Sequence, residues 1–357
     1  MQTPPTWLIA ILIPVLLKLS KSKSLPSRET IVKPNEERVV LLGASSGVGQ
    51  DLALAYAKRG AKICLFARRK QALDEVYEQC LALGCSNVLQ LAGDITNPDD
   101  LVRVRDEVIK AWGGIDTVHI LAGVPSTSTL LDIAGSPLTS SPSSTNPLAT
   151  KRFAGDPDTE GLKRVADEAR ACGEINYIGT TLALAAFLPL LSQSPSPVLH
   201  HLSSVAATVP APRRTIYAAS KAAGLMAVES CRVECEGSGV RFFSLLPGTI
   251  DNGFRLKTAT SQTGGACEVH AGVKHSFEKL LLPPEKVVEV ILEQLAINPA
   301  PAPLIPYFPF NLISWLKTPP KHLVHVPWQY RLAFMVRDTP LGWLYVEPAA
   351  RRKYAID

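Results

Sequence analysis

The pattern of apolar and polar positions is regular between residues 37 and 297. Short apolar runs alternate there with longer segments whose apolar residues recur at helical spacing. The runs expected as buried strands are 38–42, 62–67, 88–91, 116–122, 197–202 and 240–246, with 303–306 as a candidate last strand. The segments expected as helices are 46–59, 71–83, 99–112, 160–191, 216–236 and 284–297. This alternation predicts an α/β fold with a doubly wound parallel sheet.

Two segments depart from the pattern. Residues 125–150 are rich in Ser, Thr and Pro without periodicity, which predicts an exposed, mobile insertion, with a phosphorylated regulatory segment as the alternative. Residues 307–357 form an extension rich in Trp, Phe, Leu and Pro. The extension could cover an apolar substrate site, touch a membrane or bind a partner. The main domain is therefore expected at 36–306.

The first 24 residues predict a membrane segment. Residues 7–17 are uncharged and almost wholly apolar. A full span needs about 20 residues, so the run suits a tilted anchor or an interfacial helix. Lys18, Lys21 and Lys23 follow it, so by the positive-inside tendency we expect the following domain to face the cytoplasm. The endoplasmic reticulum is the expected membrane. A signal peptide and a soluble helix are the alternatives.

Composition narrows the class of protein. The 357 residues are 46% hydrophobic, enough to fill a large core. The net charge is +5 and no basic run is interleaved with aromatic residues, so nucleic-acid binding is not expected. The seven cysteines form neither a CxxC pair nor a Cys/His cluster at zinc spacing, so no metal site is expected. Scattered free thiols suit a reducing compartment.

A glycine-rich turn follows the first predicted strand. It runs Gly43-Ala-Ser-Ser-Gly47-Val-Gly49. Gly43 allows a tight turn from strand to helix, and the other two glycines let the backbone approach a pyrophosphate at the helix N-terminus. The turn therefore predicts a nucleotide site.

A pair of arginines indicates which nucleotide. Arg68 and Arg69 follow the second strand, where the ribose of a dinucleotide should arrive, and residues 63–69 contain no Asp or Glu. An acidic residue there would bind a free 2′-hydroxyl, whereas arginine accommodates a 2′-phosphate. NADP is therefore favoured over NAD, the alternative being a solvated basic helix start.

Tyr217 and Lys221 are the candidate acid and base. They lie four residues apart, so on a helix both side chains occupy one face. A nearby cation favours phenolate, which lets the phenol exchange a proton below its ordinary pKa of about 10. Together with a nucleotide site, this pair indicates hydride transfer.

These motifs resemble the classical short-chain dehydrogenase/reductases over roughly residues 37–255, and the arrangement of N-terminal anchor, core and extended tail resembles the membrane-anchored members. The order of the glycine turn, Asp94-Ile95, Asn176, Ser204, Tyr217-x-x-x-Lys221 and Pro247-Gly248 carries the resemblance. It implies a Rossmann-like fold in which Tyr217 exchanges the proton and Lys221 holds the nicotinamide ribose. It also implies that Ser204 binds the reacting oxygen and that Asn176 anchors a water in a proton relay. Ser203 is the alternative serine.

The resemblance also implies the positions that contact the cofactor. They are Gly43, Ser45, Ser46, Gly47, Val48, Gly49, Arg68, Arg69, Asp94, Ile95, Ala122, Gly123, Tyr217, Lys221, Pro247, Gly248, Thr249 and Ile250. Three departures stand out: Leu42 replaces the family's usual threonine, Ile120-Leu121 replaces its two asparagines, and Thr249 or Asn252 must take the place of its nicotinamide-binding threonine.

The resulting expectation is an NADP(H)-dependent oxidoreductase that interconverts a ketone and a secondary alcohol on a lipophilic substrate. A role like that of a 3-ketosphinganine reductase is one specific form. The small-molecule substrate and the membrane are the expected partners, with a homo-oligomer allowed. The alternatives are a non-catalytic NADP(H)-binding scaffold or sensor, and an epimerase or dehydratase, against which the glycine spacing argues.

Overall fold

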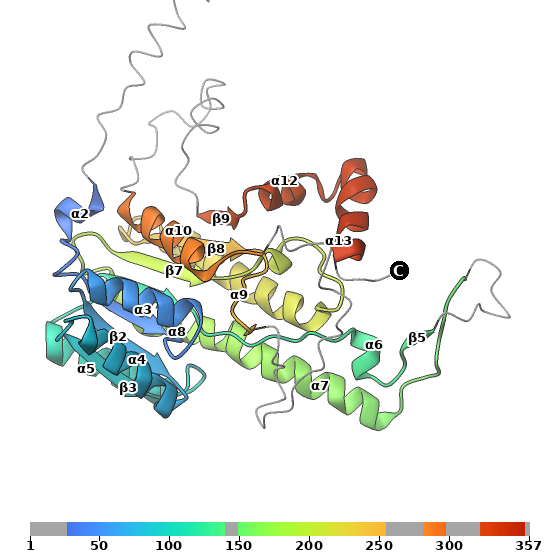
Figure 1. The fold of residues 1–357 in the computed structure, drawn as a ribbon, viewed down its shortest axis with the longest axis horizontal. Coiled ribbons are helices and arrows are strands. Elements are labelled where there is room, and N and C mark those ends of the chain that lie inside the picture. The colour runs from blue at the N-terminus through green and yellow to red at the C-terminus, as the bar shows by residue number, and fades with distance from the viewer. Residues whose placement is uncertain (1–26, 140–148, 255–280, 298–321, 354–357) are drawn as a thin grey trace, which may run out of the picture.

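A computed structural model describes residues 27–139, 149–254, 281–297 and 322–353. Its centre is a seven-stranded sheet in the order β3-β2-β1-β4-β7-β8-β9, with every neighbouring pair parallel. The strands are β1 (Arg38–Leu42), β2 (Lys62–Ala67), β3 (Val88–Ala92), β4 (Thr117–Ile120), β7 (Val198–Leu202), β8 (Arg241–Pro247) and β9 (Leu323–Val326). This topology confirms the predicted doubly wound α/β fold (Figure 1).

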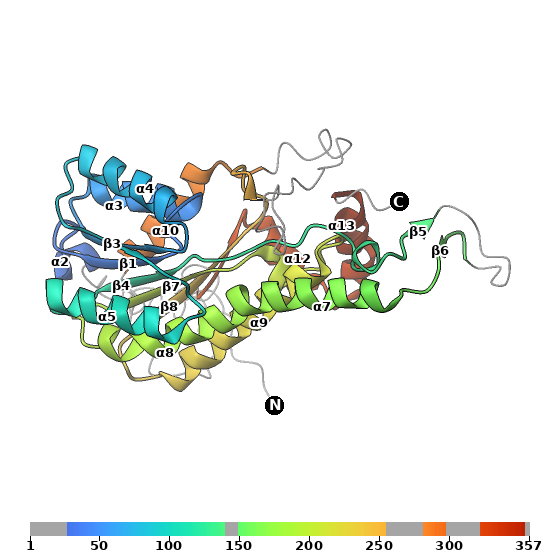
Figure 2. The same cartoon turned by 90° about the horizontal axis from the view of Figure 1, so that it is seen from below.

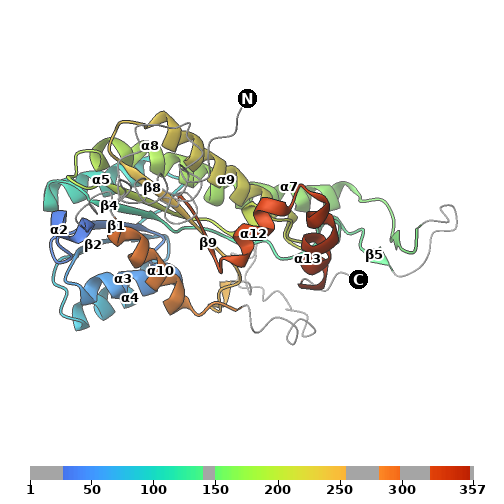
Figure 3. The same ribbon diagram turned by 90° about the horizontal axis from the view of Figure 1, so that it is seen from above.

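Helices cover both faces of the sheet (Figures 2 and 3). One face carries α3 (Val48–Lys58), α4 (Lys70–Ala82) and α10 (Pro284–Ala296), and the other carries α5 (Pro98–Trp112), α8 (Thr180–Leu191) and α9 (Thr215–Glu234). Alternate residues of β1 belong to two different apolar clusters, Val39 to one and Val40 to the other, because side chains of a strand alternate between faces. A short helix, α2 (Arg28–Ile31), precedes β1.

Local signals set the helix ends. The Asn97 side chain accepts a hydrogen bond from the backbone N–H of Asp99 and caps α5, and Pro98 takes the first helical position. Gly113 ends the helix in the left-handed conformation, at φ 72°. The helix predicted at 99–112 is therefore present with nearly the expected bounds.

The long helix expected at 160–191 is present, but its middle is a π-helix. It consists of α7 (Thr159–Gly173), η1 (Glu174–Gly179) and α8. In the described part of the chain this is the one helix long and apolar enough to cross a membrane, and half of its most apolar window is buried inside the protein. The core therefore accounts for about half of this apolar window.

The insertion after β4 is more ordered than its composition predicts. Ser126, Ala134 and Ser136 are buried, a short helix α6 (Leu130–Ile133) packs near α7, and β5 (Leu138–Thr139) pairs with β6 (Arg152–Phe153). A Cβ at Gly161 would lie 2.0 Å from the Ala134 carbonyl oxygen, so this glycine permits close packing. Burial of Ser126, Ala134 and Ser136 contradicts the expectation of exposure at these three positions, whereas β5 and β6 are mostly exposed, and 140–148 lie outside the described ranges.

The seventh strand comes from the C-terminal extension. β9 pairs with β8 in the register Ser244 to Leu323, so the sheet continues past residue 306. The candidate strand at 303–306 and the predicted membrane segment lie outside the described residues. After β9 follow α12 (Gln329–Val336), η6 (Gly342–Val346) and α13 (Glu347–Lys353), beside the loop that follows β7, where η2 (Val205–Ala207) lies.

Candidate active site

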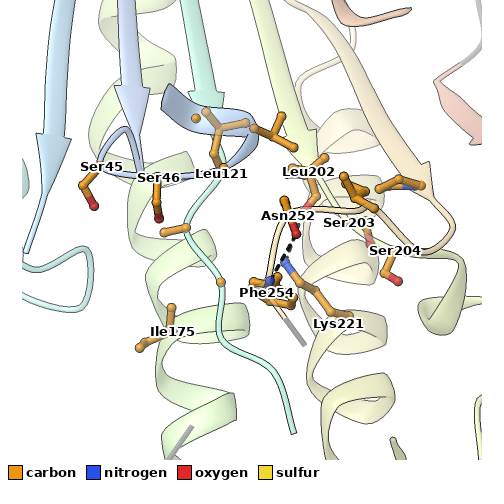
Figure 4. A pocket seen from close by; sticks show the side chains of 18 of the residues that line it. Ser45, Ser46, Leu121, Ile175, Leu202, Ser203, Ser204, Lys221, Asn252 and Phe254 are labelled. Atoms are coloured by element: carbon orange, nitrogen blue, oxygen red, sulfur yellow. Dashed lines mark hydrogen bonds between the residues drawn. The ribbon is translucent and has the colours of Figure 1, made fainter. Parts of the chain in front are cut away.

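A cleft of about 270 Å³ lies at the carboxyl ends of the parallel strands, which is where open α/β sheets bind ligands. Figure 4 shows Ser45 and Ser46 at one end of it and Ser204 and Lys221 at the other. The predicted site residues that line this cleft are Gly43, Ser45, Ser46, Gly47, Val48, Gly49, Arg68, Arg69, Ile95, Ala122, Gly123, Ser204, Tyr217, Lys221, Pro247, Gly248, Thr249 and Ile250. Asn176 and Asp94 are the two predicted residues outside the lining.

The glycine turn is built by close backbone contacts. Gly43 and Gly47 have φ values of 113° and 55°, in the region that favours glycine. A Cβ at Gly43 would lie 2.6 Å from the Ala122 backbone nitrogen, and one at Gly49 would lie 2.0 Å from the Gly43 carbonyl oxygen. No side chain caps α3 at Gly47, so the first N–H groups of an 11-residue helix face the cleft as donors for an anion.

Arg69 connects the second strand to this turn. Its Nη2 donates to Ser46 Oγ at 2.7 Å and to Ser45 Oγ at 3.1 Å. Arg68 lies 3.9 Å from the Asp94 carboxylate, with both side chains more than a third exposed, so this pair is weak. Two guanidinium groups therefore lie at the same end of the cleft as the glycine turn.

Of the predicted pair Asp94 and Ile95, only Ile95 belongs to the lining of the cleft. Asp94 Oδ1 instead accepts hydrogen bonds from the backbone N–H and the hydroxyl of Thr96, each at 2.9 Å. Asp94 therefore shapes a local turn rather than the lining. The cap of the next helix is Asn97, not Asp94.

Lys221 and Tyr217 lie on the same face of α9, as their spacing predicts, and both are buried. Lys221 Nζ donates to the Leu202 carbonyl oxygen at 3.0 Å. Burial lowers the pKa of the Lys221 ammonium from 10.5 to about 8. A Cβ at Gly123 would lie 3.0 Å from Lys221 Nζ, so this glycine leaves the space in which the ammonium sits.

Ser204 and Ser203 both line the cleft. Ser204 Oγ accepts from the Ala206 backbone N–H at 3.2 Å and caps η2, which leaves its own O–H able to donate into the cleft. Ser203 Oγ is buried and has no hydrogen-bond partner in the described part of the chain. The geometry suits Ser204 as a donor to a reacting oxygen and leaves Ser203 as the alternative.

Asn176 lies in the π-helix η1, fully buried behind the lining. Its Nδ2 donates to the Val124 carbonyl oxygen and to Ser220 Oγ, both at 2.9 Å, and its Oδ1 accepts from the Val124 N–H at 3.0 Å. These bonds join the end of β4 to α9. The water relay remains a prediction, and the contacts present are structural.

The lining also contains residues that were not assigned a site role from the sequence, among them Arg214, Phe254 and Ile175. The Arg214 guanidinium carbon lies 5.3 Å from the centre of the Tyr217 ring, and the Phe254 ring meets the same ring edge-on at 6.1 Å. Arg214 Nη2 is buried without a hydrogen-bond partner in the described residues. Its place three residues before Tyr217 is a helical spacing that could have revealed it.

Two buried histidines of β7, His200 and His201, lie outside the lining of the cleft. Burial lowers the pKa of His200 to about 3. His200 Nδ1 lies 2.8 Å from His119 Nδ1 on β4. Within the described ranges no cluster of His, Cys, Asp and Glu could hold a metal ion, and the six cysteines there are free thiols.

A comparison with protein families identifies this arrangement. The family model described as short chain dehydrogenase matches residues 37–139 and 155–263. The chain belongs to the short-chain dehydrogenase family. Members of this fold bind a nicotinamide cofactor, which is consistent with the glycine turn and the cleft above it.

Curated relatives carry names of steroid dehydrogenases. The 11-beta-hydroxysteroid dehydrogenase 1A of Arabidopsis thaliana is 35% identical over 214 residues, which are 60% of this chain and 52% of that protein. The hydroxysteroid 11-beta-dehydrogenase 1-like protein of Xenopus tropicalis is 33% identical over 184 residues, 52% of this chain and 53% of that one. The chain thus spans about half the length of the curated relatives that it matches.

A solved structure confirms the fold. The alcohol dehydrogenase of the archaeon Thermococcus sibiricus, complexed with 5-hydroxy-NADP, aligns with 81% of this chain and 95% of its own, with a TM-score of 0.54 and 21% identity.

Proposed function

We propose that this protein is an NADP(H)-dependent oxidoreductase that interconverts a ketone and a secondary alcohol on a lipophilic substrate. The observation that carries the proposal is that Ser204, Tyr217 and Lys221 line one cleft together with the glycine turn. A proton donor, an oxygen-binding hydroxyl and a nucleotide site are thereby brought to the same strand ends.

The chain's own residues would manage the proton and the developing charge. Tyr217 gives its proton to the carbonyl oxygen in reduction and removes one from the alcohol in oxidation. Ser204 donates a hydrogen bond to the same oxygen and stabilises its negative charge. Lys221 favours phenolate when protonated and is positioned to bind a ribose hydroxyl. The nicotinamide, when bound, supplies or accepts the hydride.

The choice of NADP(H) rests on Arg68 and Arg69, whose guanidinium groups suit a 2′-phosphate. The lipophilic substrate is supported by the hydroxysteroid dehydrogenase names of the relatives and by the apolar extension. A 3-ketosphinganine-reductase-like activity is one member of this substrate class. We further propose an endoplasmic reticulum membrane location with the catalytic domain facing the cytoplasm, and a homo-oligomer remains compatible with the chain.

The test uses the purified full-length protein and its Tyr217→Phe variant. The wild type should oxidise NADPH in the presence of apolar ketones. The variant lacks only the phenolic hydroxyl, so it should bind NADPH normally and turn over about 10²–10⁴-fold more slowly, the usual effect of a positioned acid/base. Activity of the variant near that of the wild type would refute the role of Tyr217. NADPH binding without turnover on any carbonyl would instead favour the non-catalytic scaffold or sensor.

A further inference from the structure

A second hollow, the extension groove, lies beside the cleft. It has a volume of about 530 Å³ and runs between the loop after β7 and the helices of the C-terminal extension. Val209 and Pro210 contribute from the loop, and Leu332, Ala333 and Val346 contribute from α12 and η6. Its volume is in the range of small-molecule sites, and its surface is almost entirely apolar.

The groove shares part of its wall with the catalytic cleft. Val205 and Ala206 line both hollows, and Val205 directly follows Ser204 in the chain. Tyr330, at the start of the groove, also packs on the cofactor side, since a Cβ at Gly248 would lie 2.9 Å from its Cε2. A molecule whose oxygen contacts Ser204 would therefore have the groove directly beside its remaining part.

The extension that forms the groove is tied to the body of the protein. β9 extends the sheet, the rings of His325 and Phe334 stack at 5.7 Å, and Arg337 Nη1 donates to the Thr208 carbonyl oxygen at 2.7 Å. These contacts hold α12 against the β7 loop. The groove is thus a built part of the fold, and its outer rim carries the exposed Leu332, Leu341 and Tyr345.

We propose that the extension groove binds an unfunctionalised hydrocarbon chain of the substrate, whose carbonyl end reaches Ser204 and Tyr217. The inference rests on the proposed function and names its substrate class. Side-chain polar groups of the lining in the described residues are limited to Gln329 and the hydroxyls of Tyr330 and Tyr345. A hydroxyl or carbonyl placed deep in the groove would lose hydrogen bonds to water without replacement, so an alkyl chain fits better than a ring system with distant oxygens.

The first experiment measures chain-length dependence with NADPH and a series of methyl ketones from butan-2-one to hexadecan-2-one. Each added methylene that enters the groove should raise kcat/KM about fourfold until the groove is filled. Ala333→Phe and Ala350→Phe place bulk in the lining, and each should reduce the ratio of kcat/KM for dodecan-2-one to that for butan-2-one at least tenfold. Ala82→Phe, on the exposed face of α4, is the matched control and should leave this ratio unchanged.

A second measurement needs no turnover. Equilibrium dialysis with radiolabelled dodecan-2-ol and the NADPH complex of Tyr217→Phe should show saturable binding that Ala333→Phe, added to that variant, weakens at least tenfold. A flat chain-length series, or binding unaffected by Ala333→Phe, would overturn the proposal. The proposal would also be wrong if dodecan-2-ol does not bind and Ala333→Phe lowers the melting temperature. The protein's own side chains would then fill the groove. Failure of the proposed function would look different: alcohol binding intact, but no ketone of any length reduced by the wild type.

Discussion

Lys221 occupies a position that disfavours its own charge. Burial lowers the pKa of Lys221 from 10.5 to about 8. This shift means that folding destabilises the charged ammonium by about 3 kcal/mol relative to the neutral amine. The unfolded chain binds more protons than the folded one between pH 8 and 10.5, so this group makes stability rise with pH across that window. Below pH 8 the destabilisation is fully present.

Lys221→Met should therefore stabilise the cofactor-free protein at pH 7 while abolishing activity. The gain should be about 1–2 kcal/mol, because the Leu202 carbonyl oxygen also loses its donor. Thermal melts at several pH values measure the difference between variant and wild type, which should shrink as pH rises from 8 to 10.5. Lys58→Met, at an exposed position of α3, is the control. A variant less stable than the wild type at pH 7 would contradict the argument.

The arginines at the other end of the cleft make a separate prediction about the cofactor. Arg68→Ala with Arg69→Ala should raise the Kd of NADPH about tenfold or more and that of NADH less than about threefold, since charge-assisted bonds to a 2′-phosphate are lost. Fluorescence titration of both nucleotides measures this. Lys70→Ala, whose ammonium pairs with Asp74, serves as the control. An equal loss for the two nucleotides would mean that the arginines only support the glycine turn through Ser45 and Ser46.

Most of the lining residues could be predicted because, in this fold, the order of the motifs along the chain determines where they lie at the edge of the sheet. The carboxyl ends of parallel strands meet at one edge, so residues that follow successive strands converge there. Phe254 could not be placed in this way, because it reaches the cleft from the loop after β8 and its contact with the Tyr217 ring depends on tertiary packing. Arg214 does not follow a strand either, and its contact with the Tyr217 ring could be inferred only from its spacing three residues before Tyr217.

At the scale of elements, the packing of η1 against α9 sets the position of the helix that carries Tyr217 and Lys221. A Cβ at Gly224 would lie 2.3 Å from the Asn176 carbonyl oxygen, so only glycine lets the two helices approach this closely. The π-helical turn at 174–179 places Asn176 between Val124 and Ser220. Such turns within α-helices are frequent at functional sites.

Gly224→Ala should separate these helices. We expect a loss of about 1–3 kcal/mol in the free energy of unfolding, as for overpacked cores, and a fall in kcat of at least tenfold because Lys221 lies one turn away. Gly173→Ala is the matched control, since nothing lies within 4 Å of its added Cβ. That change should leave the protein as stable or stabilise it by about 0.5–1 kcal/mol through helix propensity. Denaturant unfolding and steady-state rates decide the prediction, and similar effects at both positions would oppose it.

The strands and long helices of the sheet could be predicted because their periodicity is strong. The edge strand β9 was missed because Leu323–Val326 is short and lies in a segment whose tryptophans and prolines suggest no regular pattern. The elements α6, β5 and β6 were missed for a related reason. Each is two to four residues long and is held by contacts with distant parts of the chain, which local sequence does not encode.

At the scale of the whole molecule, apolar surface is concentrated on the C-terminal extension. Trp328 and Trp343 are each 68% exposed, and Leu344 and Tyr345 beside the latter are also exposed. Tryptophan and tyrosine prefer the boundary between water and lipid. We therefore propose the extension as a second membrane contact, besides the anchor predicted at residues 1–24.

The anchor hypothesis predicts that the full-length protein sediments with membranes. Deleting residues 1–24 should release much of it, and the double substitution Leu12→Lys with Leu16→Lys should do the same at unchanged length, because each charge costs about 2.5–3.5 kcal/mol inside a bilayer. If the deleted protein still sediments, adding Trp328→Ser and Trp343→Ser separates the contribution of the extension.

Protease added outside sealed microsomes should digest the catalytic domain, since Lys18, Lys21 and Lys23 favour the cytoplasmic side. A protected domain would reverse the orientation. A full-length protein that stays in the supernatant would remove the anchor, and the case for a lipophilic substrate would then rest on the extension groove and the named relatives.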